Sequence, residues 1–180
     1  HRRAAPPKAG LQTLRPSTAL AAAAGAGRAP LEARLASAGD ALDRGRIVHR
    51  LLEALPERPA AERRGVAERY LQAFRPDWPA ERRDATVAEI MAVLEDPAFA
   101  AVFAEGSRAE VEIIGRLPSG RGTEAVAGRV DRLAITPAEV LIVDYKTNRP
   151  APATLTAAPR GYIAQLAVYR QGLAGLYPGP

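Results

Sequence analysis

The sequence predicts an α/β (α+β) fold, in which a helical half is followed by a short β-rich stretch and a final helix. Two observations carry this prediction. From Leu31 to about Phe103 apolar residues recur at helical spacing, whereas from Glu110 to Tyr145 short apolar runs alternate with turn residues. No internal repeat is visible, and this order of elements indicates layers of helices packed on a sheet.

The helical half is expected to contain three helices. Ser37 or Asp40 is expected to cap the first helix, and Pro56 is expected to end it. Its apolar residues are spaced i, i+3, i+4, i+7 and so form one buried stripe of Val48, Leu51, Leu52 and Leu55. The second helix is expected over residues 60–74 and the third over residues 80–94.

The β-rich half contains three strand-like segments, at residues 111–114, 124–135 and 140–145. Turn residues at 118–122 and 136–138 separate them. The third segment is apolar on both faces, which is typical of a strand buried within a sheet. A Pro-rich loop at 148–159 then leads to a final helix expected over 161–176.

Positive charge is concentrated at one end of the chain. The 180 residues include 25 basic and 20 acidic ones, and the net charge of +5 indicates an acidic partner such as nucleic acid. Residues 1–30 contain five basic residues and no acid, and the remaining charges cancel. This segment is also rich in Ala, Pro and Gly, so we interpret it as a linker or tail, either a solvated tether or a contact for phosphate.

Several classes of protein are excluded by what the chain lacks. The absence of cysteine excludes a disulfide framework, thiolate zinc sites, cysteine-bound iron–sulfur clusters and thiol nucleophiles. No apolar run approaches the roughly 20 residues that span a bilayer, so no membrane association is expected. No G-x-x-x-x-G-K-[ST] motif occurs, so ATP binding is not expected. The chain begins without Met or a signal peptide, and we expect it to be part of a longer protein.

Asp144 and Lys146 are separated by one residue at the end of the third strand-like segment. Alternate residues of a strand share a face, and charged groups beside a buried strand are costly unless they are paired or bound to metal. Only two of the 25 basic residues are lysines, and Lys146 is one of them, which indicates a position that needs a compact ammonium charge. The two residues form either a structural ion pair or a chemical site.

Asp131 lies 13 positions before Asp144, which suits the neighbouring antiparallel strand across a short turn. Two carboxylates that face each other repel, which favours a cation between them. Oxygen ligands without thiolates favour hard ions such as Mg²⁺ or Mn²⁺. The alternative is an ion-pair network of Asp131 with Arg129 or Arg132.

Five further polar residues have two interpretations each. His49 follows Val48 at the edge of the apolar stripe, so it is either a residue of the core edge or a nitrogen ligand for a metal. Glu110 and Glu112 share one face of a strand, and either one adds a carboxylate to the site or faces solvent. Gln165 and Tyr169 share one face of the final helix, as part of the core or as support for a site.

Taken in order, these residues resemble a known family, the RecB-like nucleases of the PD-(D/E)XK superfamily. The resemblance is closest to the C-terminal nuclease domain of AddA-type subunits of bacterial AddAB helicase–nucleases. It covers about residues 40–178 and rests on five ordered motifs: Gly45 to Leu52 around His49, Ala109-Glu110-Val111, Gly128 to Arg132, Asp144-Tyr145-Lys146-Thr147, and Gln165-x-x-x-Tyr169.

The resemblance implies a restriction-endonuclease-like core, with a mixed central sheet flanked by helices, over residues 31–180. It implies a metal held by His49, Asp131, Asp144 and the main-chain carbonyl of Tyr145. Lys146 would position the attacking water and stabilise charge on the phosphate. Glu110 would be an auxiliary acid, and Gln165 and Tyr169 a supporting pair.

The resemblance also implies the partners and the activity. The expected metal is Mg²⁺, with Mn²⁺ possible, and the expected substrate is single-stranded DNA, cleaved during double-strand-break repair and recombination. An upstream helicase domain in the same full-length chain and an AddB-type subunit, which carries the iron–sulfur cluster, would be partners in the bacterial cytoplasm at the nucleoid. Two alternatives are a non-catalytic DNA-binding or subunit-docking module and a standalone RecB-like exonuclease.

Overall fold

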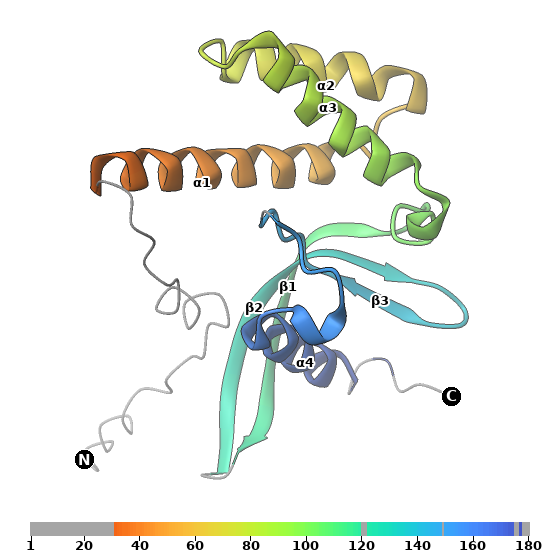
Figure 1. Cartoon of the computed structure of the whole chain (residues 1–180). Coiled ribbons are helices and arrows are strands. Elements are labelled where there is room, and N and C mark those ends of the chain that lie inside the picture. The colour runs from red at the N-terminus through yellow and green to blue at the C-terminus, as the bar shows by residue number, and fades with distance from the viewer. Residues whose placement is uncertain (1–30, 120–121, 149, 175–176, 178–180) are drawn as a thin grey trace, which may run out of the picture. The chain divides into compact units, whose positions relative to one another are not determined.

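The computed structural model describes residues 31–119, 122–148, 150–174 and 177 (Figure 1). The predicted tail at 1–30, the middle of the predicted turn at 120–121 and the last predicted helical residues at 175–176 lie outside this part. The described residues divide into two compact units. Residues 31–111 and 130–157 form what we call the site unit, and residues 112–129 and 158–177 form the α4 unit.

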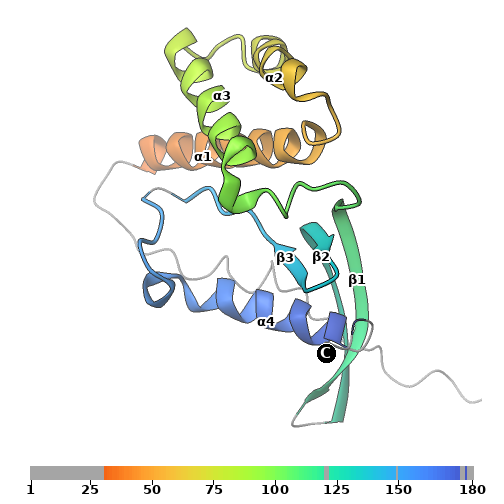
Figure 2. The same ribbon diagram turned by 90° about the vertical axis from the view of Figure 1, so that its right-hand side faces the viewer.

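Three helices form the first part of the site unit: α1 (Leu31–Ala54), α2 (Ala60–Phe74) and α3 (Ala80–Glu95). α3 packs against both α1 and α2 (Figures 1 and 2). The predicted stripe of α1 is buried, with Leu51 and Leu55 almost fully covered, and it meets Leu71 of α2 and Ile90 of α3 in one core. Burial of these apolar side chains is what holds the three amphipathic helices together.

Prolines lie at the boundaries of the three helices. α1 ends two residues before Pro56, and α2 and α3 begin directly after Pro59 and Pro79. Proline lacks an N–H and fixes φ, so it is compatible with a helix start and not with a helix interior. A 3-10 turn, η1 (Pro97–Phe99), follows α3 and is capped by Asp96, which accepts from the N–H of Ala98 at 2.9 Å.

The predicted start of the first helix is wrong. α1 begins at Leu31, so Ser37 and Asp40 lie inside the helix and not at its cap. The Asp40 carboxylate instead accepts from Arg82 of α3 at 2.6 Å. A tertiary partner of opposite charge removes the need for Asp40 to satisfy helix N–H groups.

Three strands, β1 (Arg108–Ser119), β2 (Gly122–Ile135) and β3 (Val140–Val143), form one sheet in the order β1–β2–β3. β2 pairs antiparallel with β3, from Arg132 opposite Val143 to Ile135 opposite Val140. The Thr136 hydroxyl closes the turn between them by accepting from the N–H of Glu139 at 3.0 Å. This short hairpin is the expected antiparallel connection and sets the register that the site depends on.

The prediction of a strand buried on both faces at 140–145 is wrong. β3 ends at Val143, its four residues are only half-buried, and it lies at one edge of the described sheet. Beyond the end of β3 the main chain bonds to a side chain. The N–H of Tyr145 bonds to the Asp131 side chain.

The α4 unit contains α4 (Arg160–Ala174), whose buried residues are Gln165, Tyr169 and Leu173. Their i, i+4, i+8 spacing gives this helix one covered face. A second 3-10 turn, η2 (Leu155–Ala157), precedes α4 and belongs to the site unit. Within the described residues no helix is long and apolar enough to span a membrane.

Candidate functional site

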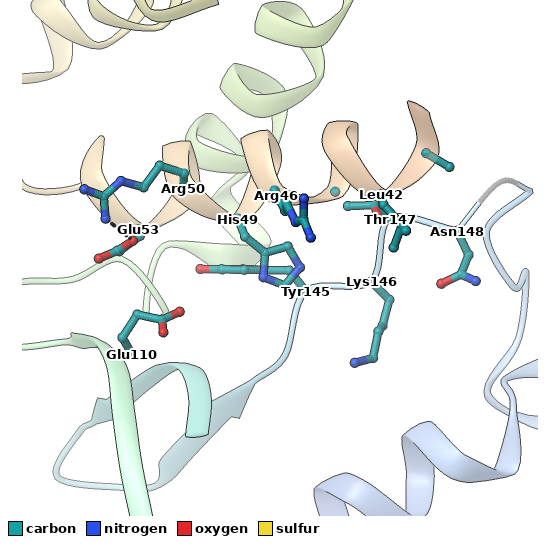
Figure 3. Close-up of a pocket in the computed structure, with 12 residues that line it drawn as sticks. Leu42, Arg46, His49, Arg50, Glu53, Glu110, Tyr145, Lys146, Thr147 and Asn148 are labelled. Atoms are coloured by element: carbon teal, nitrogen blue, oxygen red, sulfur yellow. Dashed lines mark hydrogen bonds and ion pairs between the residues drawn. The ribbon is translucent and has the colours of Figure 1, made fainter. Parts of the chain in front are cut away.

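A pocket of about 510 Å³ in the site unit lies between α1 and the segment that follows β3 (Figure 3). We call residues 144–148 the DYK segment. α1 contributes Arg46, His49 and Arg50 to the pocket, and the DYK segment contributes Tyr145, Lys146 and Asn148. These two stretches lie about a hundred positions apart in sequence, so the pocket depends on the tertiary fold.

Asp131 and Asp144 are brought together by the register of β2 and β3. The paired stretch ends at Arg132 opposite Val143, so Asp131 and Asp144 both lie directly beyond it, at the same end of the hairpin. Asp131 Oδ2 accepts from the main-chain N–H of Tyr145 at 2.6 Å, and its side chain is only 15% exposed. This bond fixes the Asp131 carboxylate against the start of the DYK segment.

Asp144 is a nearly buried carboxylate, with 8% of its side chain exposed, and it pairs with the Lys146 ammonium. Burial raises the pKa of Asp144, the Lys146 charge opposes this effect, and the neighbouring Asp131 charge adds to it. The predicted projection of Asp144 and Lys146 to the same side therefore matches their contact, although both residues lie beyond the end of β3.

His49 extends from α1 toward the DYK segment (Figure 3). Its Nδ1 lies 3.5 Å from Asp131 Oδ2, and its ring meets the Tyr145 ring edge-on, with centroids 5.6 Å apart. The interaction with the Asp131 carboxylate raises the pKa of His49, against the lowering effect of burial. His49 is therefore a neighbour of both the carboxylate pair and the DYK segment.

The two glutamates of β1 have different surroundings. Glu110 lines the pocket and has a positive φ of 53°, a left-handed conformation that is uncommon for a non-glycine residue. Glu112 lies in the α4 unit, where it accepts from Arg129 at 3.0 Å on an exposed surface. The expected common face of Glu110 and Glu112 stays a prediction.

Gln165 and Tyr169 lie in the α4 unit, as buried residues of α4. Gln165 Nε2 donates to the Tyr169 hydroxyl at 3.1 Å, and that hydroxyl donates to the carbonyl of Arg129 at 3.0 Å. The pair therefore holds the β2 main chain at Arg129, two residues before Asp131 in sequence. A supporting role for them in the site stays a prediction.

Sequence reasoning did not identify the role of Arg132, which is fully buried. Its guanidinium donates to Ser107 Oγ at 2.6 Å and to the carbonyls of Leu52 and Glu53 at 3.5 and 3.3 Å. These carbonyls end α1 and lack helical partners, so a buried cation there satisfies them and complements the helix dipole. The proposed surface pair of Asp131 with Arg132 is therefore not formed.

Arg44 was also missed, although the sequence contains a signal for it. The buried stripe of α1, extended back by four residues from Val48, reaches position 44. An arginine on a buried stripe needs a partner. Arg44 donates to the carbonyl of Thr147 at 3.3 Å and pairs with Glu89 of α3.

Asp131, Asp144 and His49 are the side chains that the resemblance assigns to a metal. Among the described residues no group of three or more His, Cys, Asp and Glu side chains is close enough to hold an ion. The donor types still fit a hard divalent cation, because Asp131 and Asp144 offer oxygen and His49 offers nitrogen. Asp144 supports this fit, because its buried charge beside a second carboxylate would be stabilised by a cation.

Comparison with known proteins identifies a family for the chain. None of the curated proteins matches the chain. The family model described as the PD-(D/E)XK nuclease superfamily matches residues 20–179, nearly the whole chain. Together with the layers of helices and antiparallel strands, this match confirms the predicted restriction-endonuclease-like fold class. The chain therefore belongs to the PD-(D/E)XK nuclease superfamily.

Proposed function

We propose that this nuclease-type domain is a metal-dependent deoxyribonuclease of AddA type, which hydrolyses single-stranded DNA ends within a helicase–nuclease in double-strand-break repair. The observation that carries the proposal is that His49 and Lys146 line one pocket while each contacts a carboxylate, His49 that of Asp131 and Lys146 that of Asp144. Nucleases of this superfamily generally use divalent metal ions. Mg²⁺ is the proposed ion, with Mn²⁺ as a substitute.

In this proposal His49, Asp131, Asp144 and the Tyr145 carbonyl hold the ion. A bound divalent cation would supply Lewis acidity toward the phosphate and the attacking water. Asp131 is prepared for this role because the N–H of Tyr145 fixes one of its oxygens. Hydrogen bonds that orient a ligand from outside typically matter almost as much as the ligand itself.

Lys146 carries the charge-stabilising role. Its side chain lines the pocket and is about a third exposed, so it is accessible from the pocket. An ammonium donates to phosphate oxygens and stabilises the negative charge that develops on them. Lys146 also pairs with Asp144, so the proposed role requires it to exchange this partner for a phosphate of the substrate.

Arg46 and Arg50 are the proposed contacts for the DNA backbone. They lie one helical turn apart on α1, on either side of His49, and both line the pocket. Arg46 is 3.5 Å from Asp43 and Arg50 is 2.8 Å from Glu53, and these exposed pairs are weak enough to be exchanged for phosphate. Phosphate contacts position a strand without reading its sequence.

The proposed partners rest on the resemblance and on the composition of the chain. An upstream helicase domain and an AddB-type subunit fit a chain that lacks the P-loop motif and cysteine, because ATP and an iron–sulfur cluster would then be bound elsewhere. The proposed location is the bacterial cytoplasm at the nucleoid.

The second candidate, a non-catalytic DNA-binding or docking module, is favoured by one observation. Asp144 pairs with Lys146, and no three-ligand group is formed among the described residues. Calorimetric titration with Mn²⁺ distinguishes the nuclease from the docking module. A nuclease binds Mn²⁺ at low millimolar concentration, and Asp144→Ala weakens this binding, whereas a docking module shows neither effect.

The direct test is cleavage of end-labelled single-stranded DNA by the chain with Mg²⁺ or Mn²⁺. We expect degradation that EDTA stops and that Asp144→Ala or Lys146→Ala lowers by about a thousandfold, since both act in the transition state. Asp84→Ala, at an exposed carboxylate on α3, is the matched control and should keep full activity. Full activity in both Asp144→Ala and Lys146→Ala would contradict the proposal.

A further inference from the structure

Arg44 is a largely buried arginine of α1, with 11% of its side chain exposed, that contacts two other segments. Its Nη2 pairs with Glu89 of α3, and its Nη1 donates to the main-chain carbonyl of Thr147 at 3.3 Å. The two terminal nitrogens of one planar guanidinium thus connect α3 to the DYK segment. A lysine ammonium has a single nitrogen and cannot reproduce this pair of contacts.

Gly45, the next residue of α1, lies against the same point of the DYK segment. A Cβ built on Gly45 would lie 3.1 Å from the Thr147 hydroxyl oxygen, which is closer than most side-chain contacts. The missing side chain therefore lets α1 and the DYK segment approach each other, while Arg44 bonds to that segment. Both residues act on Thr147, directly after Lys146.

The DYK segment has left the sheet, because β3 ends at Val143. Two main-chain hydrogen bonds bracket Lys146 in place of the strand ladder. Before it, the N–H of Tyr145 donates to Asp131, and after it, the carbonyl of Thr147 accepts from Arg44. A main chain held on both sides of a residue determines where its side chain begins.

We propose that Arg44 is a positioning residue which, with Gly45, fixes the DYK segment and so sets the place of the Lys146 ammonium relative to Asp144. The inference rests on the proposed function for its kinetic readout. The structural readout of the inference is amide hydrogen exchange in the DYK segment, which does not depend on any enzymatic activity. Misplacement of a reacting group by about 1 Å costs on the order of a hundredfold in rate.

The first test compares Arg44→Lys with Arg82→Lys in the whole chain. Arg82 also connects α3 to α1, through Asp40, and among the described residues no hydrogen bond joins it to the DYK segment, so it is the matched control for loss of an interhelical ion pair. We expect Arg44→Lys to speed amide hydrogen exchange over residues 144–148 at least about fivefold and to lower kcat about tenfold or more, with KM within about twofold. Arg82→Lys should do neither.

The second test is a double-mutant cycle that does not depend on the folding of an Arg44 variant. Gly45→Ala should lower kcat in the wild-type background, because its Cβ meets the Thr147 hydroxyl. In the Thr147→Ala background that oxygen is gone, and Gly45→Ala should have no further effect.

The outcomes separate this inference from the proposed function. Equal exchange and equal kcat in the Arg44 and Arg82 variants, or an equal effect of Gly45→Ala in both backgrounds, overturns the positioning role. Absence of DNA cleavage by the wild-type chain overturns the proposed function. Hydrogen exchange alone then decides the positioning role, by whether it rises in Arg44→Lys and not in Arg82→Lys.

Discussion

Asp131 uses one carboxylate oxygen for two neighbours, the N–H of Tyr145 at 2.6 Å and His49 at 3.5 Å. The interaction with this carboxylate favours the protonated form of the His49 imidazole and raises its pKa. A metal ligand must be a neutral imidazole, so proton and metal compete for His49. The state of this one histidine therefore depends on pH in the metal-free chain.

The pH dependence of metal-free stability is a test of the His49–Asp131 interaction. The raised pKa of His49 means that the interaction stabilises the folded state fully below 6.5, the ordinary value, and that this stabilisation is lost as pH rises through the higher folded value. We expect the midpoint of thermal unfolding, measured in EDTA, to fall more steeply above pH 6.5 for the wild type than for His49→Gln.

The comparison of the two chains isolates His49 from Asp144. Asp144 also has a raised pKa, so its contribution is lost in the same direction, starting near 3.8. Most of the Asp144 contribution is common to both chains, because His49 is the smallest of the causes that shift the pKa of Asp144. Identical pH slopes in wild type and His49→Gln would show that the imidazole gains nothing from Asp131.

Among the elements, α1 organises most of the site unit. One face carries the apolar stripe of the core, its edge carries His49, and its last carbonyls accept from buried Arg132. The DYK segment is held by Asp131 on one side and by Arg44 of α1 on the other. A short irregular segment becomes ordered because more regular elements satisfy its main-chain groups.

In the α4 unit, β2 and α4 meet at a glycine. A Cβ at Gly128 would lie 2.5 Å from the Tyr169 ring, which is buried and bonded to the Arg129 carbonyl. We expect Gly128→Ala to destabilise the chain by about 1–3 kcal/mol, because a buried ring cannot move without losing packing and its hydrogen bond. Thermal and denaturant unfolding measure this change.

Gly39 provides the control for this prediction. It lies within α1, and a Cβ added there would have no neighbouring atom within 4 Å, so Gly39→Ala adds helix propensity without a clash. We expect a gain of about 0.5–1 kcal/mol. Equal effects of the two substitutions would mean that the close approach of Gly128 to Tyr169 does not contribute to stability.

For the binding of DNA by the whole molecule, the distribution of positive charge along the chain matters more than the net charge. The excess of +5 lies in residues 1–30, while the pocket has its own cations in Arg46, Arg50 and Lys146. A protein that binds phosphate releases counterions, so each phosphate contact adds to the salt dependence of binding. The salt dependence therefore reports which basic residues meet DNA.

Deletion of residues 1–19 tests the tether interpretation. It removes four basic residues and leaves the part that matches the family model. If all four met phosphates, the slope of log affinity against log salt for single-stranded DNA would change by about 2.8. We expect a change of less than about 1, and about 0.7 for Arg46→Ala, by fluorescence anisotropy between about 50 and 200 mM salt. A change near 2.8 would make this segment a phosphate-binding arm.

Local patterns were enough to predict the fold class and most helix boundaries. α2 spans the predicted residues, and α3 extends one residue further, because apolar periodicity and proline act within a few residues of chain. The start of α1 could not be predicted this way, since Asp40 is a capping residue by type and finds its partner, Arg82, 42 positions away. The order of the five motifs was also visible in the sequence.

Only the tertiary structure brings His49 to Asp131 and surrounds the DYK segment. A hydrogen bond joins Asp131 to Tyr145 of the DYK segment, and helix packing brings Arg44 and Gly45 to Thr147. Local sequence signals extend over a few residues, whereas these contacts join positions 14 to 103 apart. They form because burying the apolar stripe of α1 leaves its polar edge facing the end of β3, where main-chain groups need new partners.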